Sequence, residues 1–316
     1  MSALIRLGTR ASPLARWQTG QVEAALHRAG HETERVELRT TGDVIADVPL
    51  TKIGSVAIFT RQLDEALLGG RIDLAVHSLK DLPTRLVAGI ILAAVGPRED
   101  PSDAFVGKNC TWDNLPRGAT VATGSVRRKA QLLHIRPDLE VVPIRGNVDT
   151  RLAKLEQSTD WAGTVLASAG LIRLGLAHRI TNRLSSHVML PAPGQGSVAV
   201  TAREDDADLL AAAAAFDHWP GAVCGTAERG LLRSMDGGCQ VPIAALAEAV
   251  RSEGGLLVRI RARVLSLDGR AMIEDSVEDL VDSLQAADAL GCVLAEALVD
   301  QGAEEILRDV RLEAGE

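Results

Sequence analysis

The sequence has few aromatic side chains and no strong positive charge. Only 2% of its 316 residues are aromatic, and tyrosine is absent, so the cores have to be built from leucine, valine, isoleucine and alanine. The formal net charge is -8. An acidic chain with few rings is poorly suited to nucleic acid, which is bound by basic surfaces and stacking aromatic side chains. Any cluster of arginines in this chain is therefore expected to serve a local purpose, such as holding a small anion.

Cysteine is also scarce, and several well-known sequence signals are missing. Cys110, Cys224, Cys239 and Cys292 show no CxxC spacing, so we interpret them as reduced thiols of a cytoplasmic protein. No stretch reaches the ~18 apolar residues of a membrane helix, and the first residues lack the apolar core of a signal peptide. No nucleotide-binding or metalloprotease motif occurs, and no cluster has the spacing of metal ligands. We expect no nucleic acid, membrane or metal partner.

The order of strand-like and helix-like runs predicts the fold class. Strands and helices alternate over the first two thirds of the chain, which indicates mostly parallel sheets covered by helices. A Pro/Gly-rich hinge at 190–197 precedes a strand that we expect to return to the first sheet. The C-terminal part is typical of a small α+β domain with an antiparallel sheet. We predict an α/β protein with one lobe at 1–97 and 196–215, a second lobe at 100–190, and a third domain at 219–316.

One segment follows neither the helical nor the strand period. Residues 41–58 contain glycines, prolines and isolated apolar residues without a regular pattern. The segment is interpreted as a long exposed loop, which is either a lid over a site or only a connection.

Arginines gather where the predicted strands end. A helix expected to begin near Ser125 has Arg127, Arg128 and Lys129 in its first turn, although the start of a helix already carries partial positive charge. Four more arginines follow other strands or begin the next helix: Arg10, Arg145, Arg151 and Arg173. Ligands of open α/β sheets bind at such strand ends, and guanidinium groups pair well with carboxylates. The pattern predicts a site for two or more bound carboxylates. The alternative is a set of ordinary surface ion pairs.

The segment HSLKDLP at 77–83 follows a predicted strand and carries polar side chains. It places Ser78, Lys80 and Asp81 at the strand end. A carboxylate in a cleft rich in arginine stays ionised, and it could steady a cationic intermediate or carry a proton. The alternative is that Asp81 caps the turn that follows.

A second reactive candidate lies in the turn SMDGGCQVP at 234–242. Cys239 follows two glycines, which allow the backbone to approach another group closely. A thiol in such a turn is accessible enough to carry a covalent adduct. The alternative is a small buried hydrophobic residue.

Eight short motifs, in order along nearly the whole chain, resemble those of the porphobilinogen deaminase family. They are IRLGTRASPLARWQT, AVHSLKDLPT, REDPSDAF, TGSVRRKAQL, IRGNVDTRLAKL, AGLIRLG, LPAPGQG and MDGGCQVPIAA. The resemblance implies two lobes like those of periplasmic binding proteins and a third domain. It also implies a cytoplasmic, monomeric transferase of porphyrin, heme and tetrapyrrole biosynthesis. Such an enzyme joins four porphobilinogen molecules head to tail with loss of ammonia, then releases the linear tetrapyrrole hydroxymethylbilane by hydrolysis.

The resemblance also implies a cofactor and particular site residues. The cofactor is dipyrromethane, bound through a thioether to Cys239, and Asp81 is the catalytic residue. Cofactor-binding residues are Cys239, Ser78, Lys80, Asp81, Thr123, Ser125, Arg127, Arg128 and Arg145. Substrate-binding residues are Arg10, Ser12, Arg145, Arg151, Arg173 and Gln195.

The sequence departs from the family pattern in two places. The family lid usually reads K-x-G-x-K-G-x-F, whereas KIGSVAIF at 52–59 keeps Lys52 and Phe59 but has Val56 and Ala57 in place of lysine and glycine. The change removes a cation and stiffens the loop. The segment ATGS stands where GTSS is common. Two other functions are considered: a two-lobed binding protein for a carboxylated ligand without chemistry, which the first two domains alone would permit, and a relative inactivated by its altered lid.

Overall fold

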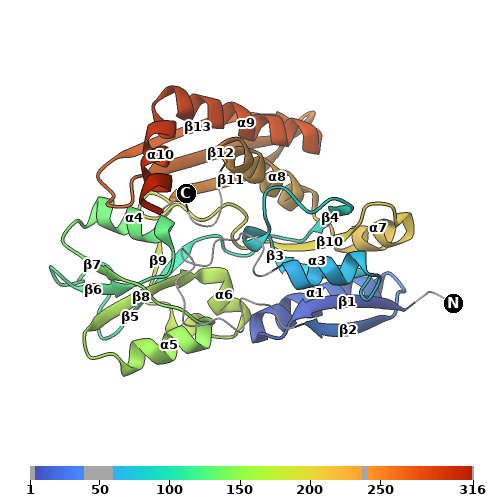
Figure 1. The fold of residues 1–316 in the computed structure, drawn as a ribbon, viewed down its shortest axis with the longest axis horizontal. Helices are drawn as coiled ribbons and strands as arrows, with labels where there is room; N and C mark the ends of the chain where they lie inside the picture. The colour runs from blue at the N-terminus through green and yellow to red at the C-terminus, as the bar shows by residue number, and fades with distance from the viewer. Residues whose placement is uncertain (1–3, 39–59, 237–240, 315–316) are drawn as a thin grey trace.

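The computed structural model describes residues 4–38, 60–236 and 241–314, which form two α/β lobes and a third domain (Figure 1). The predicted lid with Lys52 and Phe59, the loop predicted at 41–58 and Cys239 lie outside the described residues. The predicted fold class is confirmed, because each lobe has a five-stranded sheet with helices and the third domain has three antiparallel strands. The exact domain limits stay a prediction.

The sheet of the first lobe is mixed. In spatial order its strands are β2 (Thr33–Leu38), β1 (Ile5–Arg10), β3 (Leu74–Ser78), β10 (Val198–Arg203) and β4 (Ile90–Val95). The strand β1 is parallel to β2 and β3, whereas β10 is antiparallel to both of its neighbours. The strand after the Pro/Gly-rich hinge does return to the first sheet, as predicted, because β10 lies between β3 and β4.

Helices cover this first sheet and bring polar residues to its strand ends. They are α1 (Pro13–Arg28), α3 (Arg61–Leu68) and α7 (Ala207–Ala213), with short 3-10 turns η2 (Leu79–Asp81) and η4 (Ala214–Phe216). The start of α1 follows directly from the sequence: Ser12 is the N-cap, its hydroxyl accepts a hydrogen bond from the Ala15 N–H at 3.3 Å, and Pro13 occupies the first turn. Val22 and Leu26 on the inner face of α1 pack against the sheet.

The second lobe repeats the arrangement of the first. Its strands, in spatial order, are β7 (Glu140–Val142), β6 (Thr120–Ala122), β8 (Trp161–Ala167), β5 (Asp103–Gly107) and β9 (Asn182–Leu184). Its helices are α4 (Val126–Ile135), α5 (Val148–Gln157) and α6 (Ser168–Arg173), with the 3-10 turn η3 (Ala177–Arg179). Strands β7, β6 and β8 are parallel, and β5 is antiparallel to β8 and β9.

The chain crosses between the lobes twice, and the two crossings lie side by side. The first runs from β4 to β5 and the second from β9 to β10. The N–H of Gly96 donates to the Val198 carbonyl, and the N–H of Glu99 donates to the Gly196 carbonyl, both at 3.0 Å. The strand that enters each sheet from the other lobe, β10 in the first lobe and β5 in the second, is therefore the one that runs antiparallel to its neighbours.

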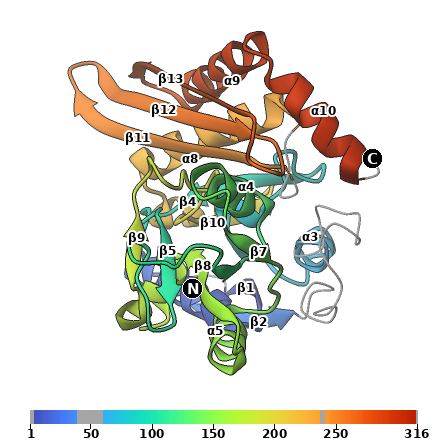
Figure 2. The same ribbon diagram turned by 90° about the vertical axis from the view of Figure 1, so that its left-hand side faces the viewer.

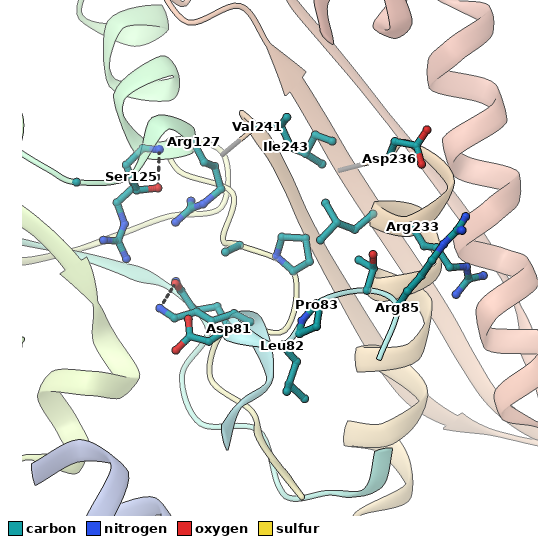
Figure 3. Close-up of a pocket in the computed structure, with 18 of the residues that line it drawn as sticks. Asp81, Leu82, Pro83, Arg85, Ser125, Arg127, Arg233, Asp236, Val241 and Ile243 are labelled. Atoms are coloured by element: carbon teal, nitrogen blue, oxygen red, sulfur yellow. Dashed lines mark hydrogen bonds between the residues drawn. The ribbon is translucent and has the colours of Figure 1, made fainter. Parts of the chain in front are cut away.

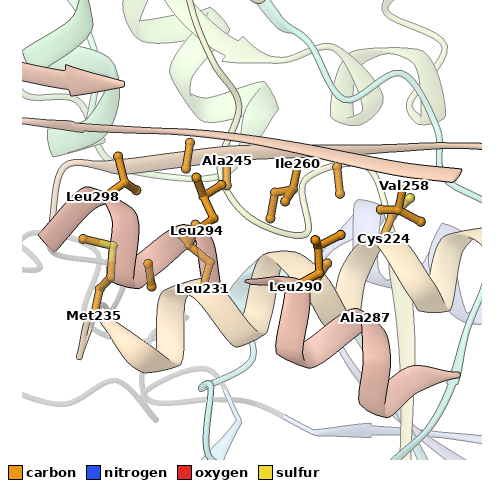
Figure 4. Packing of buried hydrophobic residues seen from close by; sticks show 14 of the residues in the cluster. Cys224, Leu231, Met235, Ala245, Val258, Ile260, Ala287, Leu290, Leu294 and Leu298 are labelled. Carbon is orange, nitrogen blue, oxygen red and sulfur yellow. The ribbon is translucent and has the colours of Figure 1, made fainter. Parts of the chain in front are cut away.

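The third domain packs the helices α8 (Trp219–Ser234), α9 (Leu284–Asp300) and α10 (Ala303–Ala314) against an antiparallel sheet. The strands of this sheet are β11 (Ile243–Ser252), β12 (Gly255–Leu265) and β13 (Met272–Val281). Figure 4 shows Leu231 of α8 and Leu294 of α9 pointing toward Ile260 of the sheet. Helices α8 and α9 approach closely at Gly291, where a Cβ would lie 2.1 Å from the Ala227 carbonyl oxygen. The core is aliphatic, as the scarcity of aromatic residues predicts.

The third domain also contacts the second lobe. Figures 1 and 2 show α4 next to the strands of the third domain. Arg263 of β12 donates a hydrogen bond to the Gln131 side chain of α4 at 2.9 Å, and the His134 ring lies 2.8 Å from the Gly269 carbonyl oxygen. These contacts hold α4 of the second lobe against the third domain.

Candidate active site

A pocket of about 520 Å³ lies where the three domains meet. The first lobe contributes residues 80–85, directly after β3, and the third domain contributes the end of α8 and the start of β11 (Figure 3). The lining residues are Lys80, Asp81, Leu82, Pro83, Thr84, Arg85, Gly124, Ser125, Arg127, Arg128, Arg151, Ala192, Pro193, Gln195, Leu232, Arg233, Asp236, Val241 and Ile243. Seven of the residues implied by the family resemblance are among them: Lys80, Asp81, Ser125, Arg127, Arg128, Arg151 and Gln195.

The start of α4 brings two arginines into the interior. Ser125 is the N-cap, as predicted, and its hydroxyl accepts from the Arg128 N–H at 3.4 Å. Arg127 and Arg128 are 4% and 5% exposed, and both pair with Asp103 of β5, at 2.8 and 2.7 Å. Asp103 therefore supplies part of the negative charge that the cationic start of α4 requires. The sequence analysis did not identify this carboxylate.

Asp103 is held in its ionised form by these neighbours. Burial alone would raise the pKa of Asp103, but Arg127, Arg128 and a hydrogen bond from Gln195 outweigh burial and hold the pKa well below its usual range. One carboxylate faces two guanidinium groups, so the cluster keeps an excess positive charge. In the described part of the chain, the Arg127 Nε is buried without a hydrogen-bond partner.

Gln195 connects this cluster to the first lobe. Its side-chain nitrogen donates to Asp103 at 2.9 Å and to the Pro101 carbonyl at 2.8 Å, and its side-chain oxygen accepts from Lys80 at 3.2 Å. Burial lowers the pKa of Lys80 to about 8, and Asp81 partly opposes this effect. A chain of polar contacts thus joins Lys80 of one lobe to Asp103 of the other.

Asp81 lies at the end of η2, half-buried on the wall of the pocket. Figure 3 shows Asp81 and Arg127 on facing sides of the pocket. The residues before Asp81 are fixed by two contacts: the Leu79 N–H donates to the Ser197 carbonyl at 3.0 Å, and Gln18 donates to the Ser78 hydroxyl at 2.8 Å. Within the described residues the Asp81 carboxylate accepts no hydrogen bond from the turn that follows it, so the alternative of a turn cap is not supported.

Arg151 adds another cation opposite Asp81. Burial, together with smaller repulsive contributions from Arg128 and Arg145, lowers the pKa of Arg151 to about 10, although Asp81 acts in the opposite direction. These four side chains therefore share one electrostatic environment. The Arg151 Nε donates to the Gly146 carbonyl at 2.8 Å, which fixes the guanidinium group at the start of α5.

The remaining expected residues within the described part of the chain are not among those that line the pocket. Arg173 ends α6, is 9% exposed, donates to the Gly196 carbonyl at 2.6 Å, and lies 5.2 Å from the ring centroid of Trp17. Burial lowers the pKa of Arg173. The others are Arg10 at the end of β1, Ser12 before α1, Ser78 at the end of β3, the buried Thr123 after β6, and Arg145 after β7.

Several pocket residues have no counterpart in the sequence analysis. Arg85 follows the Asp81 segment, whereas Arg233 and Asp236 come from the third domain. Arg233 is paired with Asp288 at 2.6 Å. The signal for Arg233 was its place just before the turn at 234–242, and Asp236 lies within that turn; for Arg85, the signal was closeness to Asp81.

The fold and the pocket together define a two-lobed α/β protein whose third domain completes a cation-rich site. Comparison with family models gives two matches: "Porphobilinogen deaminase, dipyromethane cofactor binding domain" over residues 5–211, and "Porphobilinogen deaminase, C-terminal domain" over residues 222–300. The chain belongs to the porphobilinogen deaminase family.

Curated relatives cover nearly the whole chain. Porphobilinogen deaminase of Moorella thermoacetica is 46% identical over 314 residues, which is 98% of this chain and 98% of that protein. Porphobilinogen deaminase of Syntrophotalea carbinolica is 46% identical over 312 residues, covering 97% and 96%. Among solved structures, the methionine-binding protein MetQ is 15% identical with a TM-score of 0.41, covering 67% of this chain and 89% of that chain.

Proposed function

We propose that the chain is a hydroxymethylbilane synthase, a transferase that joins four porphobilinogen molecules with loss of ammonia and releases the linear tetrapyrrole by hydrolysis. The observation that carries this proposal is the pocket between three domains, in which Asp81 faces arginines of the other lobe. The membership of the chain in the porphobilinogen deaminase family supports the same activity.

The donor groups of the pocket suit a substrate and a cofactor that carry many carboxylates. Each porphobilinogen bears an acetate and a propionate, and a guanidinium group binds a carboxylate through two parallel hydrogen bonds. Arg127, Arg128 and Arg151 line the pocket, and among the described residues Asp103 is the one carboxylate that forms ion pairs with Arg127 and Arg128. The buried Nε of Arg127, without a partner in the described part, is a donor that fits such a group. Binding of carboxylates here would complete the neutralisation that Asp103 begins.

We propose that the dipyrromethane cofactor is attached to Cys239. Asp236 and Val241, the described residues nearest to Cys239 on either side, both line the pocket. The cofactor, when bound, supplies the pyrrole carbon to which the first substrate is added. Ser78, Lys80, Thr123, Ser125 and Arg145 would contribute further contacts to its carboxylates.

Asp81 is the proposed catalytic residue. Loss of ammonia from porphobilinogen leaves a cation on the substrate, and a fixed carboxylate in a partly buried site stabilises such a charge. Asp81 interacts electrostatically with Arg151 and with Lys80, so this carboxylate lies among cations. Arg10, Ser12, Arg173 and Gln195 are proposed to bind and orient the substrate.

We further propose that the protein works as a cytoplasmic monomer, with the three domains at the limits predicted above. In the described part of the chain Cys110, Cys224 and Cys292 are free thiols, which fits a reducing compartment. None of the described helices combines the length and apolar character needed to cross a bilayer. Size-exclusion chromatography should give the mass of one 33.4 kDa chain, and a dimer mass would contradict the monomer.

The activity is tested by mass and turnover. The purified protein should colour acidic p-dimethylaminobenzaldehyde, carry the mass of two pyrrole units on the peptide that contains Cys239, and convert porphobilinogen to hydroxymethylbilane. Absence of both colour and adduct would favour the two-lobed binding protein, and an adduct without turnover would favour a relative inactivated by its lid.

Two variants separate the proposed roles. Asp81→Ala should keep the fold and the cofactor while turnover falls by about two to four orders of magnitude, the usual contribution of such a group. Cys239→Ala should give folded protein without dipyrrole. Near-normal turnover in Asp81→Ala would refute the catalytic assignment.

A further inference from the structure

The backbone that follows Asp81 is held by one side chain of the third domain. Residues 82–84 form no helix or strand. Arg229 of α8 donates to three consecutive carbonyl groups of this segment: to Leu82 at 3.4 Å, to Pro83 at 2.7 Å and to Thr84 at 3.2 Å. The contact therefore begins at the residue directly after the proposed catalytic carboxylate.

The same face of α8 packs against the residues around Asp81. Ala222, Gly225 and Arg229 are spaced three and four residues apart, so they lie on one side of the helix. Ala222 belongs to an apolar cluster with Leu79 and Leu82. A Cβ at Gly225 would lie 2.7 Å from the Leu79 Cδ2, so the helix approaches this segment as closely as a glycine allows.

The charge of Arg229 is used for this contact rather than for an ion pair. Burial lowers the pKa of Arg229 to about 10, with a smaller contribution from Arg233, so the side chain stays protonated at neutral pH. The ion pairs recorded among the described residues do not include Arg229. A guanidinium group presents five N–H donors in one plane, which allows it to bind three carbonyls at once.

We propose that Arg229 is a positioning residue that fixes the backbone after Asp81 and thereby holds the carboxylate against the bound substrate. Contacts from Ser197 and Gln18 already fix the residues before Asp81, so Arg229 restrains the other side. This inference rests on the proposed function, since it requires Asp81 to be catalytic.

The test uses the cofactor-loaded enzyme and the variants Arg229→Met and Arg229→Lys. A displacement of a catalytic group by about 1 Å costs roughly 100-fold in rate, so we expect Arg229→Met to lower kcat by about 10- to 100-fold. KM should change by less than about 3-fold, because the groups that bind carboxylates are untouched. Arg229→Lys should recover only part of kcat. Arg270→Met is the matched control, because Arg270 is a 90% exposed side chain of the same domain.

Each rate is divided by the amount of cofactor-loaded protein, which is determined by mass spectrometry of the intact chain. This normalisation removes any effect of unfolded protein. Unchanged kcat in loaded Arg229→Met would overturn the inference, and so would equal changes in kcat and KM. If Arg229→Met does not fold, Arg229→Lys decides, because a lysine ammonium group lacks the planar fork of donors that binds three carbonyls; unchanged kcat there overturns the inference. An inactive wild-type protein would refute the proposed function as well, whereas an active wild type with unaffected variants would refute only the role of Arg229.

Discussion

The substitution Asp103→Asn tests whether a single buried carboxylate sustains the arginine cluster. Asparagine keeps the size of the side chain but removes its charge. Asp103 is 0% exposed and pairs with both Arg127 and Arg128, so the variant leaves two buried guanidinium groups without a counter-ion. Gln195 would still find an oxygen acceptor in the amide group of the variant.

The expected loss follows from this geometry. Removing one partner of a buried ion pair costs about 3–5 kcal/mol, against a total stability of about 5–15 kcal/mol for a typical protein. The two arginines keep their carbonyl acceptors, the Arg127 donor at 2.5 Å from Leu190 and the Arg128 donor at 3.0 Å from Val165. These contacts place the expected loss in free energy of unfolding near the lower value, about 3 kcal/mol.

Urea unfolding of the cofactor-free chain at neutral pH measures this loss. The matched control is Glu65→Gln, which removes one partner of an exposed pair with Arg61, whose two side chains are 73% and 56% exposed. Its loss should be below about 0.5 kcal/mol. A loss below about 1 kcal/mol for Asp103→Asn would refute the argument that Asp103 is the required counter-ion.

The same pair of proteins should differ in pH dependence. The pKa of Asp103 is below its usual range because the arginines and Gln195 outweigh the effect of burial. Its stabilising contribution is therefore complete above the unfolded carboxyl pKa of about 3.9 and is lost as the pH falls through the native pKa. The difference between wild type and Asp103→Asn should be constant from pH 7 to about pH 5 and shrink below about pH 4.

Three further predictions concern a lysine, an aromatic contact and the third domain. Burial lowers the pKa of Lys80 to about 8, so its positive charge is lost as the pH rises through 8; KM should rise there, and Lys80→Met should lack this dependence. Trp17→Leu should raise KM about five-fold through loss of the cation–π contact with Arg173; Trp17→Phe should restore part of it, and an unchanged KM would contradict the role. Leu294→Ala should lower the free energy of unfolding by about 2–5 kcal/mol in urea because the side chain is fully buried; a loss as small as that of an exposed leucine would contradict this packing.

Local signals explain why the positions of many site residues could be predicted. The caps at Ser12 and Ser125 are short-range features, because a hydroxyl bonds to an N–H three residues later. Strand–helix alternation likewise indicated that Arg151 and Lys80 follow strands. Arg173 was predicted to follow a strand, whereas it ends the short helix α6; six residues that include a glycine show too little of the helical period to reveal that helix.

Contacts between residues far apart in the chain could not be predicted from the sequence. The pairing of Arg128 with Asp103 joins residues 25 positions apart, and that of Arg229 with the Pro83 carbonyl joins residues 146 positions apart. No local sequence pattern around either residue identifies its partner, because the sequence does not show which distant carboxylate or carbonyl will lie nearby after folding.

The sequence by itself determined which chemical groups are available: arginines at strand ends, one carboxylate in HSLKDLP, and one thiol after two glycines. It also determined the family, because motif order along the chain is a property of sequence alone. Only the tertiary structure decided which charges neutralise one another and which domain holds the Asp81 segment. The reason is physical: the energy of a charge or a donor depends on its burial and on the distance to its partner, and both quantities exist only once the three domains have packed together.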